Sequence, residues 1–241
     1  MTSSVKKRAL ITGASSGIGK ATALAFAKAG IDLALVSRSQ DKLEAVATAV
    51  REAGVKAKPY LLDLNQLDQV KTKIEAIAAE FASLDILVNN AGMGYTGTLM
   101  ETPLADWQHV LDLNLTSVWQ CILGVLPTMR LQQQGTIINV ASIAGLQPFP
   151  GWGAYNVSKA GLIALGKTLA AEERAYGIRV VTLTPGAVNT PIWDTDTVKA
   201  DLNRSAMLTP EIVAQTILHA ALMPQTAVID SMTLMPSAGT L

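Results

Sequence analysis

The chain of 241 residues is 49% hydrophobic and 16% charged, and its 19 basic residues are balanced by 19 acidic ones. A chain of this length and composition buries a sizeable core and fits one large domain. Because no net charge steers it toward nucleic acid or an anionic membrane, we expect a small-molecule ligand. Cys121 is the single cysteine, which excludes an internal disulfide and a multi-cysteine metal site and suits a reducing, cytoplasmic compartment.

Neither a secretion signal nor a membrane span is expected. The apolar stretch behind the basic residues of the N-terminus is broken at once by Gly and Ser. Residues 131–158 carry no charge, but their four Gln, two Asn, two Pro and four Gly make a spanning helix untenable. An uncharged stretch without a membrane predicts a strand and loop buried inside the protein.

Seven short apolar runs rich in β-branched residues predict strands, and longer segments with helical periodicity separate them. The predicted strands are residues 8–12, 32–37, 57–64, 85–90, 135–142, 178–184 and 227–236. Between the third and fourth, apolar side chains recur at the helical spacings of three and four, namely Leu67, Val70, Ile74, Ile77 and Phe81. This alternation predicts an α/β fold, a single-domain doubly wound parallel sheet over residues 1–241 with helices on both faces and ligands at the carboxyl ends of the strands.

Turn and cap residues agree with these boundaries. Glycines at positions 30, 54 and 177 follow helical segments and are expected to end them. Thr102-Pro103 and Thr209-Pro210 each offer an N-cap followed by proline at the first helical position.

The first predicted strand runs directly into the glycine-rich loop "TGASSGIG", residues 12–19, which opens a helix. Gly13, Gly17 and Gly19 allow a tight turn, close approach of the backbone to a phosphate, and close packing of helix on strand. The N-terminus of the helix then presents unpaired N–H groups to an anion. The loop predicts a dinucleotide-binding site.

The same loop matches G-x-S-x-G, the nucleophile elbow of α/β-hydrolases, with Ser15 as nucleophile. That elbow needs an oxyanion-hole loop from an earlier strand, and only a dozen residues precede it. The available bases, His109 and His219, fall in helical segments. A hydrolase is therefore the weaker alternative.

Two residues at strand ends bear on the choice of dinucleotide. Arg38 stands where a free ribose 2′-OH calls for an acidic residue, so it favours the 2′-phosphate of NADP, unless it is only a solvated side chain beside a turn. Asp63 could accept a hydrogen bond from the adenine amino group or serve as a helix cap.

At this point the chain resembles the short-chain dehydrogenase/reductase family, and the resemblance covers essentially its whole length. The matching pieces are "TGASSGIG", "DL" at 63–64, "NNAG" at 89–92, Asn114, Ser142, "YNVSK" at 155–159 and "TPGAVNTP" at 184–191. The resemblance implies a Rossmann fold, hydride transfer between a nicotinamide and a carbonyl or alcohol, and a catalytic tetrad of Asn114, Ser142, Tyr155 and Lys159.

The chemistry of this reaction makes demands that the tetrad can meet. Negative charge grows on the carbonyl oxygen as hydride arrives, so the site needs a proton donor and a second hydrogen bond, which Tyr155 and Ser142 can supply. A free tyrosine titrates near 10, and lowering its pKa to about 7 takes ~4 kcal/mol of preferential stabilisation of the phenolate. Lys159, one helical turn along, is expected to provide it. The resemblance adds that this lysine holds the nicotinamide ribose and that Asn114, with water, forms a proton relay.

The resemblance also carries a set of cofactor contacts onto matching positions. These are Gly13, Ser15, Ser16, Gly17, Ile18, Gly19, Arg38, Asp63, Leu64, Asn90, Ala91, Gly92, Tyr155, Lys159, Pro185, Gly186, Val188 and Thr190. The expected cofactor is NADP (NADPH).

A long polar connection around residues 189–208 is typical of a mobile substrate lid. Bulky apolar side chains gather on the predicted active-site loops and, with Ser142 and Tyr155, are expected to contact substrate; they are Met93, Tyr95, Phe149, Trp152, Ile192 and Trp193. Such a pocket would admit hydrophobic or aromatic ketones, although some of these side chains could belong to the core or to an interface.

Within the family, the length and catalytic order resemble 3-oxoacyl-(acyl-carrier-protein) reductases. Two features favour general carbonyl or alcohol reductases instead, because the C-terminus lacks the Gly-Gly ending of that subgroup and no basic patch for an acidic carrier protein is evident. A non-catalytic dinucleotide-binding sensor is a further alternative, but its tetrad would be damaged. The resemblance implies a homo-oligomer, a tetramer built partly on helices at 103–130 and 154–176.

Overall fold

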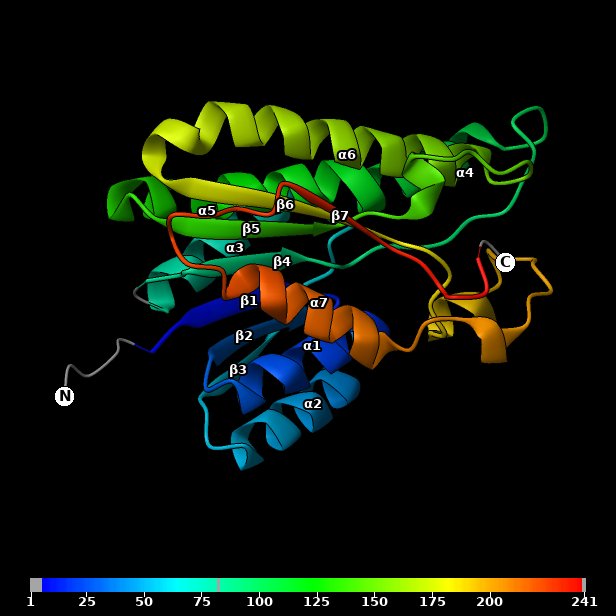
Figure 1. Ribbon diagram of the computed structural model, residues 1–241. Helices are drawn as coiled ribbons and strands as arrows, with labels where there is room; N and C mark the ends of the chain where they lie inside the picture. The colour runs from blue at the N-terminus through cyan, green and yellow to red at the C-terminus, as the bar shows by residue number, and fades with distance from the viewer. Residues whose placement is uncertain (1–5, 82, 240–241) are drawn as a thin grey trace.

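The computed structural model describes residues 6–81 and 83–239, and its centre is a seven-stranded parallel sheet (Figure 1). The strands stand in the order β3-β2-β1-β4-β5-β6-β7. Their bounds are β1 Arg8–Thr12, β2 Asp32–Ser37, β3 Ala57–Leu61, β4 Ile86–Asn89, β5 Gly135–Val140, β6 Ile178–Pro185 and β7 Ser231–Leu234. The order reverses between β1 and β4, so a crevice opens there at the carboxyl ends of the strands.

Helices cover both faces of the sheet. Their bounds are α1 Gly17–Lys28, α2 Gln40–Glu52, α3 Leu67–Glu80, α4 Leu104–Leu111, α5 Ser117–Gln132, α6 Gly153–Glu173 and α7 Pro210–Ala221. Helices α1, α2 and α7 lie on one face of the sheet, and α3, α5 and α6 lie on the other (Figure 1). The buried side chains of each set form a separate core with the sheet. The predicted doubly wound α/β fold is therefore confirmed.

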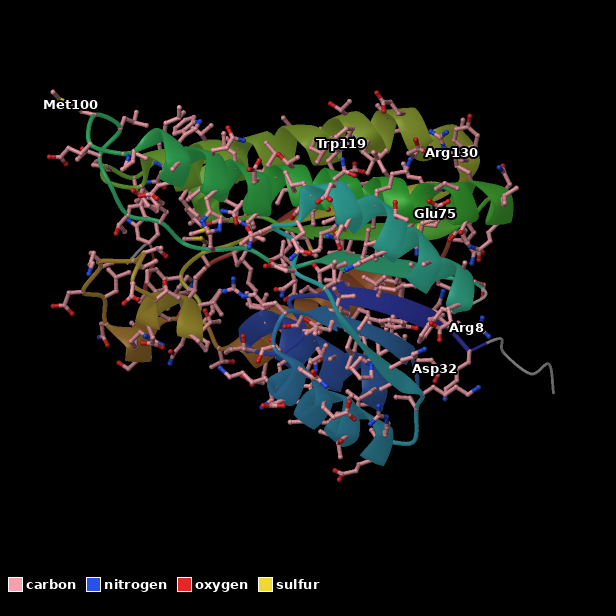
Figure 2. The ribbon with its side chains drawn as sticks, turned by 180° about the vertical axis from the view of Figure 1, so that it is seen from behind. Arg8, Asp32, Glu75, Met100, Trp119 and Arg130 are labelled. Atoms are coloured by element: carbon pink, nitrogen blue, oxygen red, sulfur yellow. The ribbon has the colours of Figure 1, made fainter. Side chains whose placement is uncertain are left out.

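Polar contacts link neighbouring segments at the amino ends of the strands. The backbone N–H of Arg8 donates to Asp85, and its guanidinium donates to Ser83 Oγ at 2.9 Å. Lys6 pairs with Asp32 at 3.0 Å. Figure 2 shows Arg8 and Asp32 together at this end, with Met100 at the opposite end of the molecule. The binding crevice lies at the end that these contacts leave free.

All seven predicted strands are present, and the differences lie at their ends. Residues 62–64 leave β3 early because Asp63 Oδ1 accepts a hydrogen bond from the backbone N–H of Asn65 at 3.0 Å and turns the chain. The last strand is only Ser231–Leu234, an edge strand paired with β6 alone.

The predicted helix ends are confirmed with one exception. Gly30, Gly54 and Gly177 have φ values of +80°, +83° and +67°, the left-handed conformation that favours glycine after a helix. At the start of α4, Thr102 does not cap the helix, because its hydroxyl donates to the carbonyl of Thr98 at 2.7 Å and Pro103 takes the N-cap position.

The helix predicted at 103–130 is divided by a π-helical turn, Asp112–Thr116, between α4 and α5. By length and composition, Leu104–Gln132 could cross a membrane, but half of its most apolar window is buried within the structure. In α5 the buried side chains, which include Cys121 and Ile122, belong to the second core. The apolar character of this segment is therefore accounted for in part by the core that α5 joins.

We expect Thr209→Ala to lower the free energy of unfolding by about 1 kcal/mol, because the Thr209 hydroxyl accepts the N–H of Ile212 and caps α7. Thr216→Ala is the matched control, since the Thr216 hydroxyl only donates back to the Ile212 carbonyl within the helix. Urea unfolding of both variants measures the difference. Equal stability of the two would contradict the assigned cap.

Candidate active site

A cavity of 590 Å³ opens at the carboxyl ends of the strands, where the strand order reverses. Its walls come from the loops that follow β1 to β6, so segments far apart in the sequence meet around it. The predicted glycine loop lines one part of the cavity, and the segment 189–208, the predicted lid, lines another. Crevices at this position are the usual ligand sites of open parallel sheets.

The glycine loop has the geometry predicted for it. Gly13 and Gly17 have φ values of +65° and +51°, and a Cβ on Gly19 would overlap the carbonyl oxygen of Gly13. Ser16 precedes α1 in an extended conformation, and within the described part of the chain its side chain makes no cap hydrogen bond to the first N–H groups of the helix. This is the cradle that a pyrophosphate requires.

Hydrogen bonds fix the loop to the end of β4. The Thr12 hydroxyl accepts the backbone N–H of Asn90 at 3.0 Å and that of Ala91 at 3.1 Å. In return, the Asn90 amide donates to the carbonyl of Thr12 at 3.0 Å. The "NNAG" segment is thereby held against the glycine loop, and its Asn90, Ala91 and Gly92 line the cavity.

The end of β2 presents a basic wall. Arg38 lines the cavity, and so does Lys42, in the first turn of α2. Sequence reasoning missed Lys42, although its position four residues after Arg38, at the start of a predicted helix, could have indicated it. Ser37 donates to Ser15 at 2.8 Å and joins this wall to the glycine loop. Asp63 also lines the cavity, but it makes a turn rather than a helix cap.

The predicted tetrad residues come together from three elements. Ser142 follows β5, Tyr155 and Lys159 lie one turn apart on α6, and all three line the cavity. Asn114 is fully buried in the π-helical turn and lies behind the cavity wall.

The side chain of Asn114 is engaged on both of its polar atoms. Its Oδ1 accepts from the N–H of Met93 at 2.8 Å, and its Nδ2 donates to the Met93 carbonyl at 2.9 Å and to Ser158 Oγ at 3.1 Å. Asn114 therefore holds the loop after β4 against α6, and its role in a proton relay remains a prediction. The wider π-turn is what brings this side chain between the two elements.

Lys159 is buried and its Nζ donates to the Val140 carbonyl at 3.1 Å. Burial lowers the pKa of Lys159 from 10.5 to about 8. Burial also raises the pKa of Tyr155, an effect that its hydrogen bond with Ser142 opposes. The Lys159 ammonium lies 5.8 Å from the centroid of the Tyr155 ring. Burial is thus the largest effect on the Tyr155 pKa in the protein alone, and the expected lowering of that pKa by Lys159 stays a prediction.

Five of the six predicted apolar substrate contacts line the cavity: Met93, Phe149, Trp152, Ile192 and Trp193. Tyr95 is the exception, since it is not among the described residues of the lining. Its hydroxyl donates to Asp106 Oδ2 at 2.9 Å, which turns the ring toward α4. Asp106 on α4 thus competes for the Tyr95 hydroxyl, and a substrate contact of Tyr95 stays a prediction. Val198 and Leu202, which sequence reasoning did not single out, line the cavity from the lid.

The segment 189–208 is more ordered than its composition predicted. It contains two 3₁₀ turns, Pro191–Asp194 and Arg204–Ala206. Arg204 joins them by donating to Asn189 at 2.8 Å and by pairing with Asp194 at 3.0 Å. The Thr197 hydroxyl donates to the Gly94 carbonyl at 2.8 Å, so the segment is fastened over the cavity to the loop after β4.

The remaining predicted cofactor contacts also line the cavity, and Gly19 alone among the described ones does not. Those that do are Gly13, Ser15, Ser16, Gly17, Ile18, Leu64, Pro185, Gly186, Val188 and Thr190. Gly19 instead packs α1 against the glycine loop. A Cβ on Gly92 would lie 3.6 Å from the Nζ of Lys159, so the loop passes close to the lysine. These residues fit a nicotinamide dinucleotide.

We expect Lys159→Met to stabilise the protein alone at pH 7 by up to about 3 kcal/mol. The folded pKa of Lys159 is below its unfolded value, so its burial penalty is fully present below pH 8 and disappears as pH rises toward 10.5. The gain should therefore shrink in that range. Urea unfolding at pH 7 and pH 10 checks this, with exposed Lys167→Met on α6 as the control. A loss of stability at pH 7 would show that the ammonium is not strained by burial.

Comparison with known proteins shows the family of this chain. Residues 7–200 match the model of the short chain dehydrogenase family. The 3-oxoacyl-(acyl-carrier-protein) reductase of Thermotoga maritima is 36% identical over 221 residues, which cover 89% of this chain and 90% of that protein. The Synechocystis enzyme of the same name is 36% identical over 243 residues, covering 97% of this chain and 96% of its own.

Solved structures agree in the same way. An alcohol dehydrogenase from Thermococcus sibiricus, complexed with 5-hydroxy-NADP, superposes with a TM-score of 0.89 at 28% identity, covering 98% of this chain and 99% of its own. L-sorbose reductase from Gluconobacter frateurii, complexed with NADPH and L-sorbose, has a TM-score of 0.88 at 34% identity, covering 98% and 97%. The chain is an oxidoreductase that belongs to the short-chain dehydrogenase/reductase family.

Proposed function

We propose that this protein reduces the ketone of a neutral substrate with NADPH, reversibly with the secondary alcohol. The observation that carries the proposal is the meeting of Ser142, Tyr155 and Lys159 on one wall of the cavity that also contains the glycine loop. A proton donor, a second hydrogen-bonding group and a dinucleotide cradle then face one space. A sensor that only binds dinucleotide has no need of this set.

The basic wall supports NADP as the cofactor. Arg38 and Lys42 line the cavity at the end of β2, where a carboxylate would be expected to accept a free 2′-OH. Two structural relatives are complexed with NADP derivatives, which agrees with this reading. The nicotinamide supplies the hydride when it is bound.

The side chains of this protein supply the proton, the hydrogen bond and the positive charge that the reduction also needs. Tyr155 donates a proton to the substrate oxygen, and Ser142 donates a hydrogen bond that keeps this oxygen in place. Lys159, one helical turn from Tyr155, adds a positive charge on the same wall. Asn114 keeps Met93 and Ser158 in position around them.

The substrate half of the cavity carries no ionised group from the part of the chain that the structure describes, apart from Lys159. The other charged residues of the lining are Arg38, Lys42 and Asp63, all at the cofactor end. A neutral carbonyl compound is therefore favoured over a carboxylate or a phosphate ester. Two substrate classes meet this requirement.

The first class is 3-oxoacyl thioesters, which are neutral and have an apolar chain. The names of the relatives from Thermotoga maritima and Synechocystis support it, at 36% identity over nearly the full chain. The second class is free hydrophobic or aromatic ketones, which the aromatic lining by Phe149, Trp152 and Trp193 favours. We propose thioesters first, in a cytoplasmic enzyme.

A homo-oligomer, a tetramer built partly on the helices at 103–130 and 154–176, stays a prediction. Association would cover apolar side chains on these segments that are exposed here: Trp119 (Figure 2), at 45% of its surface, and Val157, at 44%. No nucleic acid or membrane partner is proposed.

We expect the protein to oxidise NADPH in the presence of a 3-oxoacyl thioester, measured by loss of NADPH absorbance. The N-acetylcysteamine thioester, the carrier-protein thioester and a phenyl ketone distinguish the substrate classes. Tyr155→Phe should reduce kcat by a factor on the order of 10² to 10⁴, because it removes the proton donor. Its Kd for NADPH should stay close to that of the wild type.

Absence of turnover with every carbonyl would contradict the proposed function. A near-normal rate for Tyr155→Phe would contradict the acid assignment alone. Preference for the phenyl ketone over both thioesters would select the second substrate class.

We expect Arg38→Asp to shift the ratio of kcat/KM for NADPH over NADH toward NADH by a factor on the order of ten to a hundred. The substitution removes a charge-assisted hydrogen bond to a 2′-phosphate and adds a carboxylate that accepts from a 2′-OH. Arg174→Asp, exposed and outside the cavity lining, makes the same change of charge and is the control. An unchanged ratio would show that Arg38 does not read the 2′-phosphate.

A further inference from the structure

Trp152 lies where three cavity loops meet. It occupies the N-cap position of α6, and its backbone forms an isolated bridge with Gly97 of the loop after β4. The N–H of Gly97 donates to the carbonyl of Gly151 at 2.7 Å, and the N–H of Asn156 donates to the carbonyl of Trp152 at 2.8 Å. The backbone of Trp152 is thus held from both sides.

The indole of Trp152 contacts two other rings of the cavity wall. It packs edge-to-face on Tyr155, with ring centroids 5.5 Å apart and planes at 62°. It packs in the same manner on Trp193, with centroids 5.9 Å apart and planes at 73°. Edge-to-face pairs are directional, so each ring restricts the orientation of the next.

Trp193 belongs to the lid and follows its position. It lies in the 3₁₀ turn Pro191–Asp194, and its indole N–H donates to the carbonyl of Val188 at 2.7 Å. Asp194, the next residue, is paired with Arg204. The indole of Trp193 therefore reaches its contact with Trp152 only where the lid takes the position seen here.

The Ser158 hydroxyl donates to the Tyr155 carbonyl at 2.8 Å and holds the helix backbone. The phenol hydroxyl hydrogen-bonds with Ser142, and the orientation of the ring depends also on what packs against it. Against the ring itself lie the Trp152 indole and the Lys159 ammonium, which is 5.8 Å from the ring centroid. Trp152 thus supplies an aromatic contact that orients the phenol.

We propose that Trp152 is a positioning residue that couples the lid, residues 189–208, to the proton donor. With the lid in place, Trp193 supports Trp152, and Trp152 holds the Tyr155 ring toward the substrate oxygen. With the lid displaced, the Tyr155 ring loses this support, so proton donation is favoured only over a covered substrate. This inference rests on the proposed function in assigning Tyr155 as the donor.

The experiment uses steady-state kinetics with NADPH and ethyl acetoacetate, a small neutral 3-oxo ester. Trp152→Leu should lower kcat by a factor on the order of ten or more while the Kd for NADPH is unchanged, since only orientation at the reacting end is lost. Trp152→Phe keeps an edge-to-face ring and should recover most of kcat. Phe81→Leu, which also replaces an aromatic ring by leucine but lies at the end of α3, outside the cavity lining, is the control and should keep the wild-type rate.

The double variant Trp152→Leu/Trp193→Leu decides the coupling. If Trp193 acts through Trp152, the double variant should be no slower than Trp152→Leu alone. Losses that multiply, or an unchanged kcat in Trp152→Leu, would overturn the proposal.

Amide hydrogen exchange of residues 189–208 gives a readout that does not depend on turnover. Trp152→Leu should speed exchange in the lid several-fold, and Trp152→Phe should not. Unchanged exchange in Trp152→Leu would overturn the coupling even if kcat falls. Should the wild type reduce no carbonyl at all, the proposed function fails, while the exchange measurement still decides whether Trp152 holds the lid.

Discussion

The contact between Gly13 and Gly19 sets the position of every other part of the site. A Cβ on Gly19 would overlap the carbonyl oxygen of Gly13, so only glycine lets α1 begin this close to the end of β1. Because α1 starts there, the Thr12 hydroxyl can bind the backbone of Asn90 and draw the loop after β4 against the glycine loop. Gly92 then passes beside Lys159. The close contact of Gly13 with Gly19 is thus linked, through the loop after β4, to the position of the backbone beside Lys159.

The sequence could predict the structural features that depend on residues close to one another in the chain. Buried strands and glycine-ended helices are encoded by neighbouring residues, which is why the sheet and the glycine loop agree with expectation. The orientation of a side chain depends on partners that are distant in sequence, as the hydrogen bond from Tyr95 to Asp106 shows. The π-helical turn at Asn114 could not be predicted from the sequence either, because the hydrophobic periodicity of the helix continues through it. Spacing placed Tyr155 beside Lys159, but it could not show that burial would dominate both pKa values.

The cavity wall that carries the reactive groups contains a buried charge, which is unfavourable in a protein interior. Lys159 is buried, and among the residues that the structure describes it has no carboxylate partner and donates to one carbonyl, that of Val140. An ammonium kept in such surroundings lowers the stability of the fold, and it is available to attract an electron-rich group that enters the cavity. The nearby polar side chains of Asn114 and Ser158 hydrogen-bond to the backbone and to each other. These hydrogen bonds hold the elements that carry the reactive groups.

In the segment 189–208, different side chains hold the backbone and line the cavity. Arg204 and hydrogen bonds such as that from Thr197 to the Gly94 carbonyl hold the segment, whereas the apolar side chains of Ile192, Val198 and Leu202 line the cavity. Exchange of these apolar side chains would alter the volume offered to a substrate and leave the fastening intact. Descendants of such a protein could therefore acquire new substrates through single substitutions, and the same three positions are where a designer would start to retune its selectivity.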